Sequence, residues 1–284
     1  MIKKILLILG ICVALGVGVW VFLFVAFIVD MEKGEKHQRQ IREEQRSGKW
    51  DFGDQPALFA VAHAIVTNDQ DAIRAAAKAL QNLQAPGRDG TTLLYFAVTQ
   101  SWQRPELGES VKALLSLGAD PNYTNGQRDS LAMFNAVHAS ADVLRAMLEA
   151  GGNPNARDEL GQPMILMNWY LGYYQNQAKA RMDLLLEHGA DVNSAMPASE
   201  WPDSGYTLLL YRTKMGLDDH LAYADALTLL ERGADPNRAG ADGMTFGKML
   251  TDHRAHFGKL KPTPVEFAAL WDWAEKHGIV QQAR

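Results

Sequence analysis

The residues best suited to metal chemistry are Asp252, His253 and His256, near the C-terminal end of the chain. His253 and His256 are three positions apart, so on a helix they share one face. A zinc site needs three or four protein ligands, and no further ligand stands nearby at a recognisable spacing. We therefore interpret this segment as a polar surface helix and expect neither a metal nor a cofactor. A metal-dependent enzyme that uses these three side chains is the alternative.

Other catalytic patterns are missing from the sequence. It contains no GxSxG nucleophile turn, no HExxH helix and no glycine-rich phosphate loop. Two adjacent carboxylate pairs, Glu43-Glu44 and Asp218-Asp219, are interpreted as solvated because neighbouring residues on a helix point apart. The formal net charge of -5 gives no bias towards nucleic acid. The sequence thus argues against an enzyme and against a nucleic-acid-binding protein.

Aromatic residues offer a better indication of a binding surface. Met167, Tyr170, Leu171 and Tyr174 follow helical spacing and share one face, while Trp169 lies on another. One of these faces must be buried, and we expect the other to lie near the surface.

Three more aromatic residues follow in the next 40 positions, and Tyr and Trp are enriched where proteins bind one another. Packing in the core is the alternative at each position. The predicted partner-binding residues are Met167, Tyr170, Tyr174, Trp201, Tyr206 and Tyr211.

The N-terminus carries a long apolar run. No charge occurs from Ile5 to Val29, and Lys3 and Lys4 precede the run. At about 1.5 Å per residue such a helix can cross a hydrocarbon core of roughly 30 Å. The run is too long for the apolar region of a cleaved signal peptide, and no small-x-small site follows it. The sequence therefore predicts one retained transmembrane helix.

Within this run Gly10, Ala14 and Gly18 recur every four residues. Small residues at that spacing let two membrane helices approach closely, so self-association through them is a hypothesis. The alternative is that small residues are simply common in such helices. The only cysteine, Cys12, also lies here, which excludes an intramolecular disulfide.

The remaining sequence divides into a charged segment and a globular region. Residues 1–4 form a tail before the apolar run at 5–29, and residues 30–50 are interpreted as a solvated stalk or a helical extension. From residue 51 to residue 284 the composition becomes globular, and a repeat is visible.

Four short stretches anchor the repeat. Gly118 to Asn122, Gly189 to Asn193 and Gly233 to Asn237 read Gly-Ala-Asp-Pro/Val-Asn, and Gly151 to Asn155 is a looser copy. Each follows an amphipathic segment, so the glycine is expected to end a helix in the left-handed conformation. The Asp and Asn that follow can hold a tight turn by bonding to their own backbone.

The other end of each unit is marked by glycine and threonine. Thr92, Thr207 and Thr245 each stand two residues after a glycine, where the hydroxyl can cap the next helix. We expect the first unit to contain helices at Pro56–Val66 and Asp71–Leu83, and the last to end in a helix at Pro264–Lys276. Further units begin near Asp89, Asn125, Gly161, Gly205 and Gly243.

This pattern, with Gly118 and Gly151 33 residues apart, resembles the ankyrin repeat from about residue 51 to the end. The resemblance implies an all-α solenoid of about six helix-turn-helix units, here preceded by one transmembrane helix. Two departures from the family are visible. The histidine of the family's Thr-Pro-Leu-His stretch is replaced by Tyr95, Leu166, Leu210 and Lys248. The finger loop after Gly189 is lengthened between Ser194 and Asp203.

In ankyrin proteins the inner helices and finger tips line a concave surface that grips a partner. The resemblance therefore implies a membrane-anchored module that binds a protein partner, similar to immunity or inhibitor proteins that neutralise a toxin at the membrane. An assembly scaffold for an inner-membrane complex is the alternative.

The location is expected to be the bacterial inner membrane, with a single pass. The Lys and Arg residues after the apolar run outnumber those before it, which by the positive-inside rule places the repeats in the cytoplasm. The Lys-Lys start resembles an uncleaved signal anchor and favours the other side. We favour an extracytoplasmic, periplasmic repeat domain.

Overall fold

The computed structural model describes residues 33–124, 126, 130–170, 177–199, 203–258 and 263–281. The apolar run at 5–29, with Gly10, Ala14 and Gly18, lies outside these ranges. Within them, no helix combines the length and the apolar character needed to cross a bilayer. The membrane helix therefore stays a prediction.

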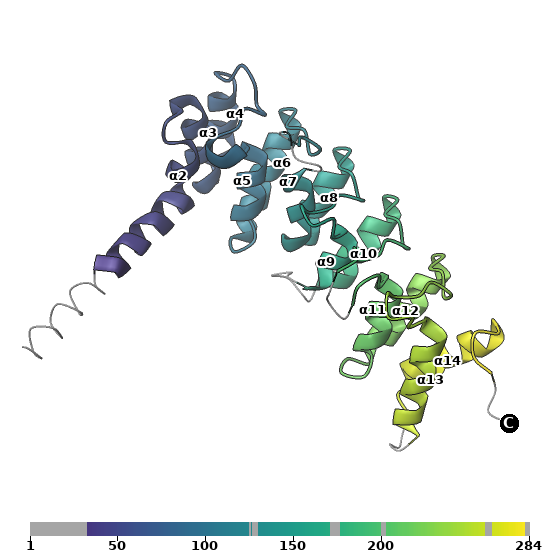
Figure 1. Ribbon diagram of the computed structural model, residues 1–284. Helices are drawn as coiled ribbons and strands as arrows, with labels where there is room; N and C mark the ends of the chain where they lie inside the picture. The colour runs from purple at the N-terminus through teal and green to yellow at the C-terminus, as the bar shows by residue number, and fades with distance from the viewer. Residues whose placement is uncertain are drawn as a thin grey trace, which may run out of the picture.

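The described residues form two rows of short antiparallel helices that stack along one direction (Figure 1). After a helix at residues 33–47, the units pair their helices in chain order. The helices are α2 (Lys49–Phe52), α3 (Pro56–Val66), α4 (Gln70–Ala77), α5 (Leu93–Gln100), α6 (Gly108–Ser116), α7 (Leu131–Asn135), α8 (Ala141–Glu149), α9 (Met164–Tyr170), α10 (Ala178–Glu187), α11 (Leu208–Met215), α12 (Leu221–Glu231), α13 (Phe246–Phe257) and α14 (Val265–Lys276), with 3-10 turns η1 (Arg88–Gly90), η2 (Pro105–Leu107) and η3 (Ala136–His138).

Within each row, helices of neighbouring units pack on one another. In the first row, which we call the inner row, α3 packs on α5, α5 on α7, and α11 on α13. In the second or outer row, α4 packs on α6, α6 on α8, α8 on α10, and α12 on α14. Leu185 of α10 is fully buried, as the apolar periodicity of its segment predicts. The core therefore runs the length of the stack between the rows.

Helix ends follow the sequence signals closely. The hydroxyls of Thr92, Thr207 and Thr245 accept hydrogen bonds from the third residue on and so cap α5, α11 and α13. Four glycines just after the outer helices have φ between 88° and 92°, where a Cβ would be strained. These are Gly118, Gly151, Gly189 and Gly233. Both predictions about unit boundaries are thus confirmed.

Hairpins join each outer helix to the next inner helix and are tied to one another by asparagine side chains. Asn122 donates from Nδ2 to the carbonyl of Gly151 at 2.8 Å, and its Oδ1 accepts the backbone N–H of Asn153 at 2.7 Å. One hairpin earlier, Gln84 takes the place of the asparagine and donates from Nε2 to the carbonyl of Gly118 at 3.0 Å. Asn155 and Asn193 repeat the full pattern with the following units. The turn asparagines therefore hydrogen-bond one unit to the next.

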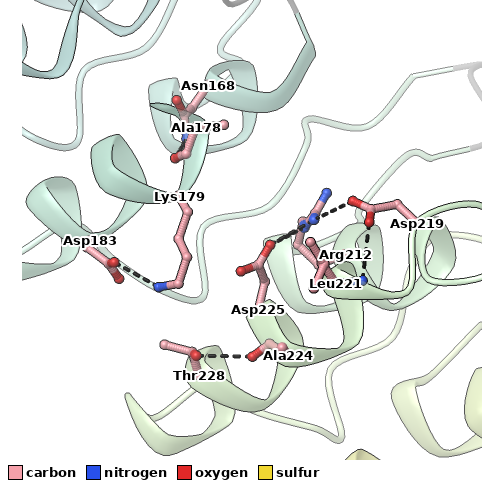
Figure 2. A network of polar contacts seen from close by, with 10 residues as sticks. All are labelled: Asn168, Ala178, Lys179, Asp183, Arg212, Asp219, Leu221, Ala224, Asp225 and Thr228. Atoms are coloured by element: carbon pink, nitrogen blue, oxygen red, sulfur yellow. Dashed lines mark hydrogen bonds and ion pairs between the residues drawn. The ribbon is translucent and has the colours of Figure 1, made fainter. Parts of the chain in front are cut away.

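Two units carry buried polar pairs between their inner and outer helices. Arg181 of α10 is fully buried and donates from Nε to Oδ1 of Asn168 on α9 at 2.7 Å. Burial lowers the pKa of Arg181 to about 10. In the next unit, Arg212 of α11 donates to the carboxylate of Asp225 on α12 at 2.7 Å (Figure 2). Figure 2 also shows Asp219 on the other side of the Arg212 guanidinium, at 3.4 Å.

The helix at residues 33–47 extends away from the stack beside α2 (Figure 1). Its residues 33–40 are all exposed, and few of its side chains are apolar. Ion pairs one turn apart support it, such as Arg39 with Glu35 at 3.2 Å. The helical extension expected for the charged segment is therefore present.

Two expectations need correction, one about where a helix ends and one about which side chains a helix exposes. α4 ends at Ala77 rather than Leu83, because turns replace the helix at residues 78–79. The segment around Asp252 and His256 is helical, but its interpretation as an entirely polar surface helix was wrong. His253 is buried, with its ring against Tyr223 of α12.

Candidate protein-binding surface

A small notch opens between two neighbouring hairpins on the inner-helix side. Its walls come from the hairpin at Asp89 and Gly90, from Tyr123 and Thr124 of the next hairpin, and from the first turns of α5 and α7. The notch has a volume of about 20 Å³, enough for one small group. Here a partner can contact backbone, hydroxyl and aromatic groups together.

Tyr95 and Leu131 supply the apolar part of the notch. Both are half-buried, on the first turns of α5 and α7, where Thr92 and Ser130 cap the helices and fix their direction. Burial raises the pKa of the Tyr95 phenol, and the nearby Asp51 carboxylate raises it further. The phenol therefore stays neutral and can donate or accept a hydrogen bond.

This notch was not predicted from the sequence. Tyr95 was considered only as the residue at the position of the family's histidine, and Tyr123 was not singled out. One signal was present, because Tyr95 occupies the inner-helix position that follows a finger. The closeness of Tyr123 depends on how two hairpins stack, which a repeat pattern does not specify.

The hairpins before α11 and α13 form a second polar cluster, centred on Tyr206. Its hydroxyl donates to Oδ2 of Asp242 at 2.9 Å, and its ring covers Gly240, where a Cβ would come within 2.5 Å of the ring. Burial and the bond to Asp242 raise the pKa of Tyr206 to about 12. The backbone N–H of Ala241 donates to the carbonyl of Ser204 at 2.8 Å, so the two hairpins are directly joined.

The predicted partner-binding residues fall into two groups. Met167, Tyr206 and Tyr211 are 8%, 5% and 9% exposed and belong to the core, so each offers little surface to a partner. The backbone of Tyr170 ends α9. Tyr174 and Trp201 lie outside the described residues. A role in partner binding stays a prediction for these positions, and Tyr206 demonstrably joins two units.

Trp169, assigned to the other face of the same segment, is half-buried. The guanidinium of Arg212 lies 3.7 Å from the centre of its ring, a cation–π contact between the fourth and fifth units. This residue therefore contributes to packing between units.

The candidate metal ligands do not converge. Asp252 and His256 are exposed, whereas Nδ1 of His253 faces the hydroxyl of Tyr223 at 2.9 Å. Across the described ranges, no group of three or more His, Cys, Asp or Glu side chains is placed to hold a metal ion.

Comparisons with known proteins agree with this architecture. No family model matches the chain. It is 32% identical over 114 residues to the E3 ubiquitin-protein ligase KEG of Arabidopsis thaliana, a match that covers 40% of this chain. It is 21% identical over 213 residues to the ankyrin repeat protein L371 of Acanthamoeba polyphaga mimivirus, which covers 74% of this chain. The chain spans only 7% and 24% of the lengths of these two relatives.

Among solved structures, an ankyrin repeat domain from Acinetobacter baumannii AYE superimposes with a TM-score of 0.58 at 20% identity. The superposition covers 78% of this chain and 98% of that domain. With the paired helices, the hairpins and the helix-ending glycines, this likeness shows that the chain has the ankyrin-repeat fold.

Proposed function

We propose that this protein is a membrane-anchored module that binds another protein through the inner-helix and hairpin surface of its ankyrin stack. Ankyrin repeats are typically protein-interaction modules. The observation that carries the proposal is the notch at Tyr95, Tyr123 and Leu131, where partly exposed aromatic and apolar side chains meet backbone groups. Tyrosine in such a setting is enriched among residues that dominate binding energy.

The anchor in this proposal is the apolar run at residues 5–29. The polar helix at residues 33–47 then acts as a spacer of about 20 Å between bilayer and repeats, at about 1.5 Å per residue. Its surface charges keep it in water. We place the repeats outside the cytoplasm, at the bacterial inner membrane, where a partner crossing the periplasm can reach the stack. Neutralising a toxin at the membrane is the role that best fits this arrangement.

The test begins with affinity capture by the full chain in detergent, followed by mass spectrometry and a measured Kd for the captured partner. Tyr95→Ala and Tyr123→Ala are expected to weaken that Kd at least about thirtyfold if the notch is a binding hot spot. Leu221→Ala is the matched control, since Leu221 is 66% exposed at the start of α12, away from the notch.

Thermal unfolding of each variant separates binding from folding. A partner that binds both tyrosine variants as tightly as the wild type would exclude the notch as its site. If the capture yields no protein whose binding survives purification, the proposed function itself fails.

A further inference from the structure

Three hairpin asparagines recognise the following unit in the same way. Asn122, Asn155 and Asn193 each donate from Nδ2 to the carbonyl of the next helix-ending glycine, at 2.8 to 3.3 Å. Each also accepts, on Oδ1, the backbone N–H two residues beyond that glycine, at 2.7 to 2.8 Å. The recognised feature is therefore a pair of backbone groups, a carbonyl and an N–H two residues later.

Asn237 occupies the same position in the last hairpin. Its backbone N–H bonds to Oδ1 of Asp235 at 2.9 Å, just as Asn122 bonds to Asp120 at 2.8 Å, so the turn is built in the same way. Gly278 ends α14 with a φ of 71°, as the earlier glycines end their helices. Yet within the described ranges the Asn237 carboxamide makes no hydrogen bond to this segment. The last asparagine is thus positioned without its usual partner.

The residue after the glycine also differs. It is small in the earlier units, as at Ala119, Ala190 and Ala234, but it is Ile279 after α14. Ile279 packs on Gly247 of α13, where a Cβ would lie 3.0 Å from the Ile279 carbonyl oxygen and 3.1 Å from its Cγ2.

A cavity of about 540 Å³ lies beside Asn237. It is bounded by this hairpin, the first turns of α13 and residues 279–281. The volume is in the range of ligand-binding pockets. Lys248 and Asp252 both line it, so their charges balance, while Met244 and Val280 supply apolar surface. A neutral occupant with hydrogen-bonding groups and a small apolar side chain suits these walls.

We propose that Asn237 and this cavity bind a segment of another protein through its backbone. The segment would supply a carbonyl to Nδ2 and an N–H, two residues later, to Oδ1, with a small residue between them. Main-chain recognition of this kind gives affinity with little dependence on sequence. This surface is distinct from the notch at Tyr95 and does not depend on it, so the chain carries a second docking site in its last unit.

The test uses a fluorescein-labelled peptide that copies residues 229–238, which presents the glycine carbonyl and the N–H recognised by Asn193. Saturable binding to the full chain in detergent micelles is measured by fluorescence anisotropy. Asn237→Ala is expected to weaken binding about tenfold, and N-methylation of the peptide at the position of Asp235 is expected to do the same. The urea midpoint of Asn237→Ala should equal that of the wild type.

Asn193→Ala is the matched control. It removes two bonds inside the stack, so it should lower the urea midpoint while leaving peptide affinity unchanged. Three results would overturn the proposal. The first is the absence of saturable binding to the wild type, and the second is equal affinity for the N-methylated peptide or for Asn237→Ala. The third is self-association in sedimentation that Asn237→Ala abolishes, because the occupant would then be a second copy of this chain.

Discussion

The hydroxyl of Tyr223 lies 2.9 Å from Nδ1 of His253, and both side chains are buried between the fifth and sixth units. The Tyr223 ring also meets Phe257 and Phe267 edge to face. An imidazole in this apolar setting is favoured in its neutral form, because burial lowers the pKa of His253 below its ordinary value of 6.5. The junction between the last two units is therefore expected to lose stability in acid.

The first prediction follows from that pKa. The pKa of His253 is lower in the folded protein than in the unfolded chain. The stability that neutral His253 contributes is therefore complete above about pH 6.5, and it is lost as the pH falls through the pKa of the folded protein. The Tm of the wild type should fall between about pH 7.5 and about pH 5. His253→Gln should show a smaller fall, and His256→Gln, at an exposed position, should behave as the wild type. The same dependence of Tm on pH in all three proteins would contradict this role of His253.

The second prediction concerns the asparagine contacts between units. Asn155→Ala removes the bonds to Gly189 and to the N–H of Asp191. Net hydrogen bonds contribute about 0.5–1.5 kcal/mol each, so unfolding in urea should lose about 1–3 kcal/mol. Asn135→Ala is the comparison, since the Asn135 carboxamide donates to the Leu131 carbonyl within its own helix. A smaller loss for Asn155→Ala than for Asn135→Ala would refute the role of the contacts.

The third prediction concerns the core of the fourth unit. Leu185→Ala should reduce the free energy of unfolding by about 2–5 kcal/mol, because the fully buried side chain leaves a cavity. Leu221→Ala, at a position 66% exposed, should change it by less than about 0.5 kcal/mol. Similar values for the two variants would mean that the core does not extend to α10.

The fourth prediction separates the packing of Tyr206 from its hydrogen bond. Tyr206→Phe keeps the ring on Gly240 and loses the bond to Asp242, so stability should fall by about 1–2 kcal/mol. The backbone N–H of Met244 donates to Oδ1 of Asp242 at 2.9 Å and helps hold the pKa of Asp242 below its ordinary value, so the carboxylate stays charged near neutral pH. Asp242→Asn keeps a side-chain oxygen that can accept this bond, so it should cost less than Tyr206→Phe. Binding of the captured partner by Tyr206→Phe then tests the predicted contact directly.

These sites show what a sequence reveals about this fold. Helix ends marked by a threonine cap or a glycine were predictable, because they depend on local chemistry such as the Thr92 hydroxyl or the backbone freedom of Gly118. The burial of His253 was not, since it depends on Tyr223, 30 residues earlier in the chain. The same holds for the notch, where Tyr95 and Tyr123 meet only after two hairpins stack.

The asparagines are an intermediate case. Their recurrence after glycine indicated a turn, and the turn is present, with the backbone N–H of Asn122 held by Asp120. The sequence did not indicate that the same residue also reaches Gly151, because that bond needs the rise and rotation between units. Aromatic spacing around Met167 was similarly ambiguous between core and surface, and the structure places that residue in the core.

The fifth prediction concerns membrane topology. Fusions at the C-terminus to one reporter active only outside the cytoplasm and another active only inside it should give activity from the first alone. The expectation is motivated by the Lys3-Lys4 start before the apolar run. Activity of the cytoplasmic reporter alone would show that the Lys and Arg residues of the stalk set the orientation.

The two buried polar pairs also determine how this chain can be recombined. Asn168 with Arg181 and Arg212 with Asp225 occupy equivalent places, 44 residues apart in the sequence. The asparagine contacts between hairpins bind backbone groups, so they do not depend on which helix pair follows. Exchanging a single helix is different. A unit that joined the inner helix bearing Arg212 to the outer helix bearing Arg181 would bury two guanidinium groups facing each other. Neither would have the Asp225 carboxylate as a partner, which is strongly destabilising. The interchangeable part of this protein is therefore the helix pair and not the helix.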